Sequence, residues 1–451
     1  MRIVVIGGVA AGTSAAAKAR RNMPDAEIAI YEKDRYISYA GCGIPYYIGD
    51  VVKNIESIAP RDPAYFKKVY DVDVHTEHEV ISIDPETNTL VVKNLITGNT
   101  FEDRYDRLVL AMGARAVVPP IKGADRDNVF VLRNIQDMFK VKKYIDKNNP
   151  RKAVIIGTGF IGQEVSENFK LLGMEITMVE KLDQVTPGLD PDMAIHVEEH
   201  LKQKGVSVIT GASVEEIGDN AVKLADGTNL DAEIVILATG VRPNVEIAKE
   251  AGIELGDTGA IRVNDRLETN LKGIYACGDC AEQIHIITGK PVFRPLGTTA
   301  NKMGRIAGDN VSGGDLPYRG VLGTGIFRVF DMTVAFTGLS EREAKNEGYS
   351  VVTSMDRKLS KTSYMDGKEI IIKGVADAKT GRLLGAQIVG EDGVDKRIDV
   401  FVTAITFGAK AEDLFHLDLA YSPPYSTARD PVMYTGMILE SAIRKFEREN
   451  K

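Results

Sequence analysis

Residues 152–162 have the sequence KAVIIGTGFIG, which is the clearest indication of the fold. The apolar run at 152–156 is typical of a strand buried on both faces, and the glycines after it complete a G-x-G-x-x-G pattern before a helix-forming segment. A helix that begins at such a turn points free backbone N–H groups at a pyrophosphate. The next apolar strand, MEITMVE, ends at Glu180, where a carboxylate binds a ribose 2′-hydroxyl and repels a 2′-phosphate. The stretch therefore predicts a Rossmann-like site that prefers NADH to NADPH.

A second version of this pattern opens the chain, as RIVVIGGVAAG at residues 2–12. Val9 occupies the second glycine position, so this fingerprint is less complete than the other. Glu32 ends the following apolar strand, EIAIYE, about 20 residues further on, where it can bind a ribose hydroxyl. Because the spacing from the strand to the acid is the same in both stretches, we interpret each stretch as the start of a nucleotide-binding unit.

The starts of these two units divide the chain. LVLAMGARAVVPP, which contains Gly113, marks the crossover into the second unit, and IVILATGVRPN marks the return from it. From about residue 325 the sequence changes to alternating strand patterns, which are typical of an antiparallel sheet in a separate domain. We therefore predict an α/β protein with two Rossmann-like nucleotide-binding domains and a C-terminal α+β domain. The predicted ranges are 1–114 with 245–324 for the first domain, 115–244 for the second and 325–451 for the third.

Composition restricts the class of protein. The 451 residues include 56 Lys and Arg against 64 Asp and Glu, a formal net charge of −8, which argues against a general nucleic-acid binder. Three cysteines are too few for a disulfide-stapled secreted scaffold and suit a reducing compartment. No apolar stretch reaches the roughly 18 residues that a membrane span needs. We expect a cytoplasmic enzyme.

On these residues the chain resembles the flavin-dependent pyridine nucleotide disulfide oxidoreductases. The landmarks match in order along essentially the whole chain, although Ala111-Met112-Gly113 replaces the usual A-T-G before the crossover. The resemblance implies FAD at the first fingerprint, NADH at the second and a homodimer formed by the C-terminal domain. It assigns Gly7, Gly12, Glu32, Lys33, Gly113 and Asp279 to FAD, and Gly157, Gly159, Gly162, Glu180 and Gly240 to NADH.

The cysteines indicate the subfamily. Two-cysteine members carry C-x4-C beside the flavin, but here Cys42 is followed at the second position by Tyr47. Instead, SYAGCGIPYYIGD at residues 38–50 resembles the single-cysteine branch, which includes coenzyme A-disulfide reductases, persulfide and polysulfide reductases, NADH oxidases and NADH peroxidases. Flanking glycines permit close approach to a ring, and we expect a polarised site to lower the pKa of the Cys42 thiol.

Several residues favour the coenzyme A members of this branch. The first glycine loop has no histidine, unlike the loop in NADH peroxidases and many NADH oxidases. The resemblance implies that Tyr364 and Tyr421 of the partner subunit donate protons near Cys42, with Tyr425 as an alternative to Tyr421. Lys18 and Arg21 lie three residues apart on one predicted helix face and could hold the coenzyme A phosphates. By resemblance the coenzyme A-binding positions are Ser14, Lys18, Arg21, Ser38, Tyr70, Asn301 and, from the other subunit, Arg429.

The leading hypothesis is an NADH-dependent flavoprotein that reduces coenzyme A disulfide, or coenzyme A persulfide or polysulfide, through Cys42 and a Cys42–S–S–coenzyme A intermediate. One alternative is an NADH oxidase that reduces oxygen through a Cys42 sulfenic acid. Another is a redox-sensing protein whose Cys42 is capped by coenzyme A. The sequence leaves open the natural oxidant, the strictness of NADH over NADPH and whether coenzyme A stays bound.

Two further motifs are assigned no chemistry. His196 to His200 fits H-x-x-E-H, but the surrounding apolar spacing is that of an ordinary helix, so we expect no metal site. Cys277-x2-Cys280 has the spacing of a redox motif, but it encloses the Gly278-Asp279 flavin signature, so we expect no active dithiol there.

Overall fold

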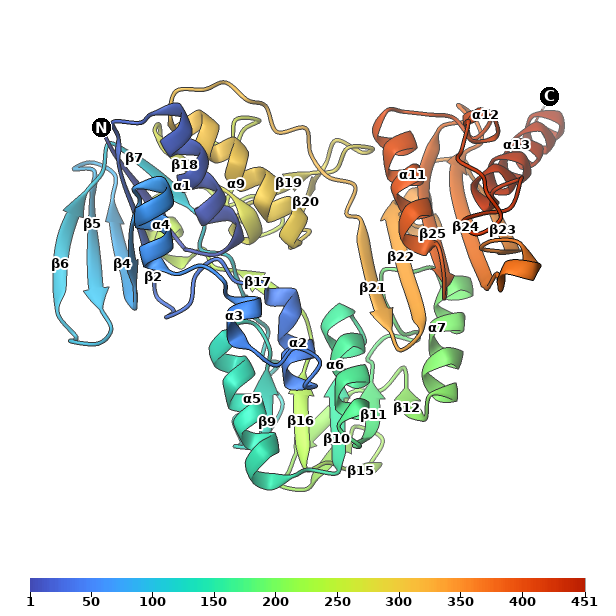
Figure 1. The fold of residues 1–451 in the computed structure, drawn as a ribbon, viewed down its shortest axis with the longest axis horizontal. Coiled ribbons are helices and arrows are strands. Elements are labelled where there is room, and N and C mark those ends of the chain that lie inside the picture. The colour runs from blue at the N-terminus through green and yellow to red at the C-terminus, as the bar shows by residue number, and fades with distance from the viewer. Residues whose placement is uncertain (451) are drawn as a thin grey trace.

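The computed structural model describes residues 1–450. Figure 1 shows three parts, with the N-terminal part at the left, a second part below it and the C-terminal part at the right. Each part is built around one five-stranded sheet. The first two sheets are parallel and the third is antiparallel, so the fold class predicted from the sequence is confirmed.

The first sheet has the strand order β18-β7-β1-β2-β3. Its central strand, β1, pairs in parallel with β2 on one side and β7 on the other, and all but one of its residues are buried. The last strand, β18, comes from a distant stretch of the chain, so the first part is assembled from two segments. The strands are β1 (Arg2–Ile6), β2 (Glu27–Glu32), β3 (Asp73–Thr76), β7 (Arg107–Leu110) and β18 (Ile274–Ala276).

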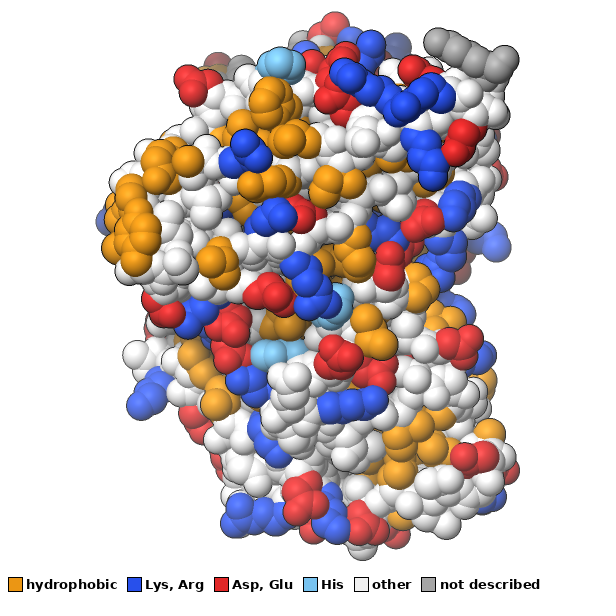
Figure 2. Space-filling model, turned by 90° about the vertical axis from the view of Figure 1, so that its right-hand side faces the viewer, with side chains coloured by type: hydrophobic (Ala, Val, Ile, Leu, Met, Phe, Trp, Pro, Cys, Tyr) orange, Lys and Arg blue, Asp and Glu red, His pale blue; other side chains and the backbone are white. Residues whose placement is uncertain are grey.

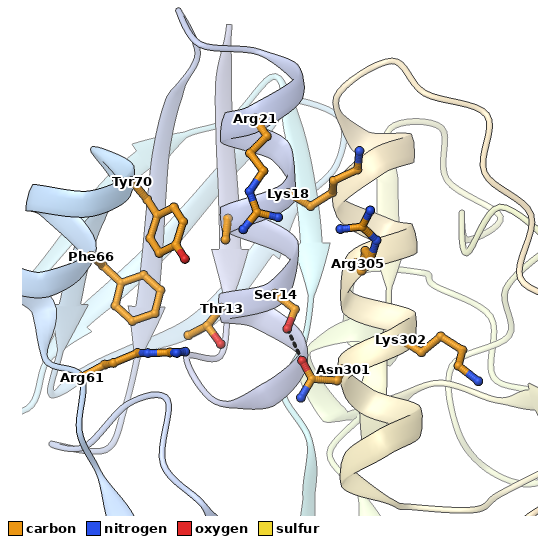
Figure 3. Close-up of a pocket in the computed structure, with 11 residues that line it drawn as sticks. Thr13, Ser14, Lys18, Arg21, Arg61, Phe66, Tyr70, Asn301, Lys302 and Arg305 are labelled. Atoms are coloured by element: carbon orange, nitrogen blue, oxygen red, sulfur yellow. Dashed lines mark hydrogen bonds between the residues drawn. The ribbon is translucent and has the colours of Figure 1, made fainter. Parts of the chain in front are cut away.

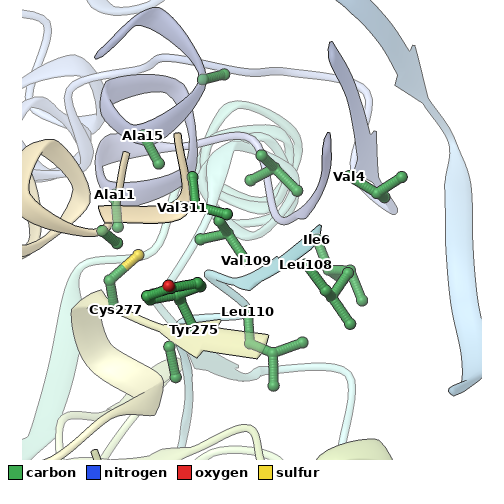
Figure 4. Close-up of a cluster of buried hydrophobic side chains, with 14 of the residues drawn as sticks. Val4, Ile6, Ala11, Ala15, Leu108, Val109, Leu110, Tyr275, Cys277 and Val311 are labelled. Carbon is green, nitrogen blue, oxygen red and sulfur yellow. The ribbon is translucent and has the colours of Figure 1, made fainter. Parts of the chain in front are cut away.

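Helices cover this sheet, and a three-stranded antiparallel sheet, β4-β5-β6, lies beside it. The two longest helices of the first part, α1 and α9, pack against each other over a core that includes Val4, Leu108, Tyr275 and Cys277 (Figure 4). The elements are α1 (Ala10–Asn22), η1 (Gly41–Gly43), α2 (Ile44–Ile48), α3 (Ile55–Ile58), α4 (Pro63–Tyr70), β4 (His78–Asp84), β5 (Thr89–Asn94), β6 (Thr100–Arg104), η2 (Gly278–Cys280), β19 (Gln283–Ile284), β20 (Pro291–Val292) and α9 (Gly297–Val311).

The second parallel sheet, with the order β12-β11-β10-β16-β9, repeats this plan. Its central strand, β10, lies between β11 and β16 as β1 lies between β2 and β7. The elements are β9 (Val129–Val131), α5 (Ile135–Asn148), β10 (Lys152–Ile156), α6 (Phe160–Leu171), β11 (Glu175–Val179), α7 (Pro191–Gln203), β12 (Val206–Ile209), β13 (Val214–Ile217), β14 (Ala221–Leu224), β15 (Asn229–Asp231), β16 (Ile234–Leu237) and α8 (Glu246–Glu250).

Two short antiparallel strands, β8 (Ala114–Ala116) and β17 (Val241–Pro243), pair where the chain enters and leaves the second unit. This pairing lies at the crossover that Gly113 and Gly240 predict from the sequence. The exact domain boundaries remain a prediction.

The C-terminal sheet has the order β21-β22-β25-β24-β23, and α11 and α13 pack on it. Strands β24 and β25 are buried almost throughout, so both faces of the sheet are covered there. Within residues 1–450, no helix combines the length and apolar character needed to cross a membrane. The elements are β21 (Gly325–Val329), β22 (Met332–Gly338), α10 (Glu341–Asn346), β23 (Val351–Leu359), η3 (Ser363–Met365), β24 (Glu369–Asp377), β25 (Leu383–Gly390), α11 (Val394–Thr406), α12 (Asp413–His416) and α13 (Pro431–Glu449).

Candidate active site

The two glycine turns have nearly the same geometry. Gly7 and Gly157 follow β1 and β10 with φ of 105° and 106°, a backbone conformation that favours glycine. A Cβ at Gly12 would collide with the Gly7 carbonyl, and a Cβ at Gly162 would collide with the Gly157 carbonyl. Each turn therefore leaves a narrow backbone cradle at the start of a helix, which fits the pyrophosphate of a dinucleotide.

The two acids predicted to hold ribose groups lie beside these cradles. Glu32 is buried and accepts a hydrogen bond from the Gly8 N–H at 2.6 Å, and burial raises the pKa of its carboxyl. Glu180 is also buried and accepts hydrogen bonds from the N–H and the hydroxyl of Thr158, at 3.0 and 2.7 Å. Each carboxylate is thus fixed by the glycine turn that it serves.

The remaining predicted cofactor residues occupy the surroundings of these turns. Gly113 and Gly240 have positive φ where the chain crosses between the two parallel sheets. No side chain approaches the place where a Cβ of Gly159 would lie, so that turn is open. Lys33 is exposed next to the buried Glu32. These positions are compatible with a bound cofactor.

Asp279 lies in η2 and forms an ion pair with Arg133 at 2.7 Å. Arg133 also donates a hydrogen bond from Nε to the Ala114 carbonyl at 2.8 Å. Arg133 could not be found from the sequence, because it lies far from Asp279 along the chain and belongs to no motif. The ion pair brings the second sheet unit into contact with the predicted flavin-binding residue.

Cys42 lies in η1, immediately before α2, and is exposed with a free thiol. Desolvation by its neighbours raises the pKa of the Cys42 thiol, the charge of Glu164 raises it further, and the charge of Arg133 lowers it. The expectation that the site lowers the pKa of this thiol was therefore wrong. The surrounding chain presents a carboxylate as well as a guanidinium to the thiol.

Glu164 is a second residue that the sequence analysis missed. It lies on α6, which packs against α2 directly after Cys42. Burial, followed by the charge of Glu167, raises the pKa of Glu164 to about 7, while a hydrogen bond with Tyr46 lowers it. A titratable carboxyl therefore lies near the only exposed cysteine among the described residues.

A cavity of about 380 Å³ lies between α1, α4 and α9 (Figure 3). It brings together five predicted coenzyme A-binding residues, and the hydroxyl of Ser14 donates a hydrogen bond to Asn301 across it at 2.6 Å. The sequence analysis missed three cationic side chains of the wall, Arg61, Lys302 and Arg305. The lining residues are Thr13, Ser14, Ala17, Lys18, Arg21, Arg61, Phe66, Tyr70, Asn301, Lys302 and Arg305.

Most of the positive charge in this cavity is not neutralised by the chain. Lys18 pairs with Asp309 at 2.9 Å, and the Arg21 guanidinium lies 5.8 Å from the centre of the Tyr70 ring. Among the described residues, no carboxylate lies within ion-pair distance of Arg21, Arg61, Lys302 or Arg305. The cavity is therefore suited to an anionic ligand with several charges.

The other predicted substrate residues lie outside this cavity. Ser38 has left-handed backbone geometry and donates its N–H to the Gly8 carbonyl at 2.8 Å, beside the first glycine turn. Tyr364, Tyr421 and Arg429 are exposed on the C-terminal part, as is Tyr425, and Figure 1 shows this part well apart from α2. A single chain therefore does not bring these tyrosines to Cys42.

The C-terminal part exposes much apolar surface. Figure 2, a view of its outer face, shows several groups of hydrophobic side chains over the upper half of the molecule. Large exposed apolar patches mark interaction surfaces. The exposed apolar side chains of this part include Met365, Phe407, Phe415 and Ile438 as well as the three tyrosines.

The two motifs without assigned chemistry lie at η2 and in α7. Cys277 and Cys280 are fully buried free thiols, and burial raises the pKa of each. His196 and His200 lie in α7. In residues 1–450, no cluster of three or more His, Cys, Asp or Glu side chains could hold a metal ion.

These features are those of an oxidoreductase with two nucleotide sites, and the chain belongs to the pyridine nucleotide-disulphide oxidoreductase family, which matches residues 1–299. The dimerisation domain of the same family matches residues 326–432. The protein is therefore a pyridine nucleotide-dependent enzyme with a domain that forms dimers.

Individual relatives are similar over nearly the full length. An NADH oxidase of Methanocaldococcus jannaschii is 37% identical, with 100% of both chains covered. An NAD(P)H sulfur oxidoreductase (CoA-dependent) of Pyrococcus furiosus is 38% identical over 97% of this chain and 99% of its own. The solved structure of an NAD-dependent persulfide reductase from A. fulgidus has 40% identity and a TM-score of 0.95, and the match covers 98% of this chain and 83% of that one.

Proposed function

We propose that this enzyme uses NADH to reduce a coenzyme A-linked persulfide, polysulfide or disulfide at Cys42. The observation that carries the proposal is the cationic cavity of Figure 3 in a protein whose net charge is −8. The ADP part of coenzyme A carries several phosphate charges, and guanidinium groups bind phosphate well. The Pyrococcus furiosus relative is itself named as coenzyme A-dependent.

A short segment of chain connects this cavity to the thiol. Arg61 lines the cavity, and Ile58, three residues earlier, accepts a hydrogen bond from the N–H of Ala40 at 2.9 Å. Ala40 is two residues before Cys42, and Ile58 also packs beside Gly43. A carrier held by its phosphates in the cavity can therefore extend its sulfur end along this segment toward Cys42.

The glycine turns and their acids would hold FAD at Gly7, Gly12 and Glu32, and NADH at Gly157 to Gly162 and Glu180. The chemistry that FAD supplies when bound is two-electron transfer between NADH and sulfur. Asp279, paired with Arg133, would position the flavin ribityl chain.

At the thiol site, the Cys42 thiolate attacks one sulfur of the substrate. A bond forms between Cys42 and that sulfur, the substrate S–S bond breaks, and the departing sulfur takes a proton from Tyr364 or Tyr421 of the partner subunit. Two electrons, which come from NADH overall, and a second proton then release the bound sulfur compound as a thiol. Cys42 is then a thiolate again, and the tyrosine takes a proton from water, which completes the cycle.

The test is anaerobic NADH consumption with coenzyme A disulfide, coenzyme A persulfide and polysulfide as separate oxidants. We expect substrate-dependent turnover that Cys42→Ser reduces at least about 1,000-fold without loss of bound flavin. Cys280→Ala is the matched control, because Cys280 is buried and should leave turnover intact. Full turnover by Cys42→Ser would refute the role of this thiol.

A second candidate function is NADH oxidation by oxygen through a Cys42 sulfenic acid. The observation that favours it is the Methanocaldococcus jannaschii relative, which is named as an NADH oxidase and aligns over the whole chain. Aerobic NADH consumption without any sulfur substrate distinguishes the two. A rate in air that exceeds every anaerobic rate would favour the oxidase.

The proposal includes a homodimer in which each Cys42 site is completed by tyrosines of the other chain. Support comes from the dimerisation domain and from the exposed positions of Tyr364 and Tyr421, far from α2. It also includes a reducing, cytoplasmic location, because an exposed thiol such as Cys42 stays free in such a compartment.

A further inference from the structure

Arg397 on α11 is a guanidinium buried in the C-terminal part, with 1% of its surface exposed. Its Nε and Nη2 donate to the two carboxylate oxygens of Asp430 at 3.0 and 2.9 Å. Burial by itself raises the pKa of Asp430, but hydrogen bonds from Arg397 and Ser426 lower it below its ordinary value. The pair is therefore ionised, and each member depends on the other.

The remaining bonds of Arg397 reach the base of one tyrosine loop. This loop, residues 360–368, connects β23 to β24 and carries Tyr364 in η3. Nη2 of Arg397 donates to the Ser360 carbonyl at 2.7 Å, and the Ser360 hydroxyl accepts the N–H of Lys368 at 3.1 Å. Arg397 thus contacts the loop where its two ends meet.

The same guanidinium reaches the second tyrosine loop. This loop, residues 417–430, connects α12 to α13 and carries Tyr421 and Tyr425. Nη2 donates to the Ser426 hydroxyl at 3.3 Å, and that hydroxyl donates to Asp430 at 2.6 Å. Asp430 also caps α13, since it accepts the Val432 N–H at 3.0 Å.

Few other contacts join the loops. The Thr362 hydroxyl donates to the Pro423 carbonyl at 3.2 Å, and Lys396, next to Arg397, donates to the Tyr425 carbonyl at 3.0 Å. By contrast, the side chains of Tyr364, Tyr421 and Tyr425 project outward and are 50 to 72% exposed in the single chain. The loops are therefore held at their bases, and within residues 1–450 Arg397 is the one buried group outside the loops that bonds to both.

We infer that Arg397 is a positioning residue that sets the two tyrosine loops as one unit for the partner subunit's Cys42 site. The inference rests on the proposed function for the role of the tyrosines, but the coupling of the loops stands on the hydrogen bonds alone. Lysine cannot replace this guanidinium, because a single ammonium has three donors and no planar fork for the Asp430 carboxylate.

The first test measures amide hydrogen exchange in the full-length dimeric holoenzyme. In Arg397→Lys, we expect residues 360–368 and 417–430 to lose protection together, by about tenfold or more. The matched control is Lys373→Met, which removes another buried cation of the same part. Lys373 pairs with Asp192 and Glu341 and contacts neither loop, so its loss should leave loop exchange unchanged.

Faster exchange in only one loop, or in neither, would overturn the inference. If Arg397→Lys does not fold, Ser426→Ala replaces it, because it deletes the two bonds that the Ser426 hydroxyl makes with Arg397 and Asp430 and should loosen both loops by a smaller factor. Hydrogen exchange does not depend on enzyme activity, so it tests the coupling of the two loops even if the proposed function is wrong.

The second test is a double-mutant cycle on turnover. We expect Arg397→Lys to slow anaerobic turnover of the sulfur substrate about tenfold, while anaerobic bleaching of the flavin by NADH keeps its rate. In the Arg397→Lys background, adding Tyr364→Phe or Tyr421→Phe should slow turnover only a little further. In the Lys373→Met background, each Tyr→Phe change should slow turnover by the same factor as in the wild type. Additive effects in both backgrounds would overturn the catalytic part of the inference. No effect of either Tyr→Phe in the wild-type background would contradict the proposed function instead.

Discussion

The two strand–turn–helix units of this protein, β1 with α1 and β10 with α6, have the same glycine turn but are not used in the same way. In both, a glycine with φ near 105° follows the central strand, and a buried glutamate receives a backbone N–H of the turn. The helices that follow differ. The outer face of α1 is cationic and lines the cavity through Lys18 and Arg21, whereas α6 presents Glu164 to the region of Cys42.

The packing of glycines explains the positions of α1 and α6. α1 contacts α9 closely because Gly304 and Gly308 bring that helix against the backbone of Ala11 and Ala15. α6 instead packs on α2, where Gly49 leaves room for Asn168. The local motif therefore determines the cradle, while the outward side chains and the neighbouring helix determine what the unit does.

Gly12→Val should have the largest effect. A side chain there meets the Gly7 carbonyl, which is backbone and cannot move aside cheaply. We expect a loss of more than about 4 kcal/mol in stability or outright failure to bind flavin. Flavin absorbance of the purified protein and thermal unfolding measure this.

Gly162→Val is the paired variant, because its side chain would meet the Gly157 carbonyl in the same way. It should keep the flavin and lose reduction by NADH. If both variants lose flavin equally, the two turns do not serve separate nucleotides.

Arg21→Ala tests the cationic face of α1. Because Arg21 has no carboxylate partner in the described chain and lines the cavity, we expect the KM for a coenzyme A substrate to rise about tenfold, or about 1.4 kcal/mol, with kcat nearly unchanged. The effect should shrink at high salt. Lys170→Ala on α6 is the control and should leave KM unchanged, since Lys170 donates to the Gly205 carbonyl instead.

Much of the difference between the two units could be predicted from the sequence. The contacts between distant segments could not, for a physical reason. The glycine turns, Glu32, Glu180 and the pair Lys18 and Arg21 follow from local patterns with fixed spacing. Arg133, Glu164 and Arg305 belong to no motif and act only because folding brings their helices or loops beside a distant residue. The pKa of Cys42 likewise depends on such neighbours, so the expectation of a polarised site that lowers it had the wrong direction.

Glu164→Gln tests the acidic face of α6. The pKa of Glu164 is about 7, so its carboxyl becomes charged as the pH rises through 7, and that charge raises the pKa of Cys42. Removing it should lower the thiol pKa and speed alkylation of Cys42 by iodoacetamide about fivefold at pH 8. The difference between variant and wild type should fade below about pH 6, where Glu164 is neutral.

The control for this measurement is Glu167→Gln. Glu167 lies on the same helix, but its carboxylate accepts the Phe330 N–H at 2.9 Å on another side. Its loss should change the Cys42 alkylation rate much less. A faster rate in Glu167→Gln than in Glu164→Gln would contradict the assignment of this charge effect to Glu164.

The smallest expected effect distinguishes the two buried glutamates. Glu180→Gln removes the charge that repels a 2′-phosphate but keeps an oxygen for the Thr158 hydroxyl, so the ratio of kcat/KM for NADPH to that for NADH should rise about threefold. The change is small because Lys181 next to it already offsets part of the repulsion. Glu32→Gln, at the equivalent place in the other unit, should leave the ratio unchanged, since the proposal places no nicotinamide nucleotide there. If Glu32→Gln changes the ratio as much as Glu180→Gln does, the two units do not bind separate nucleotides.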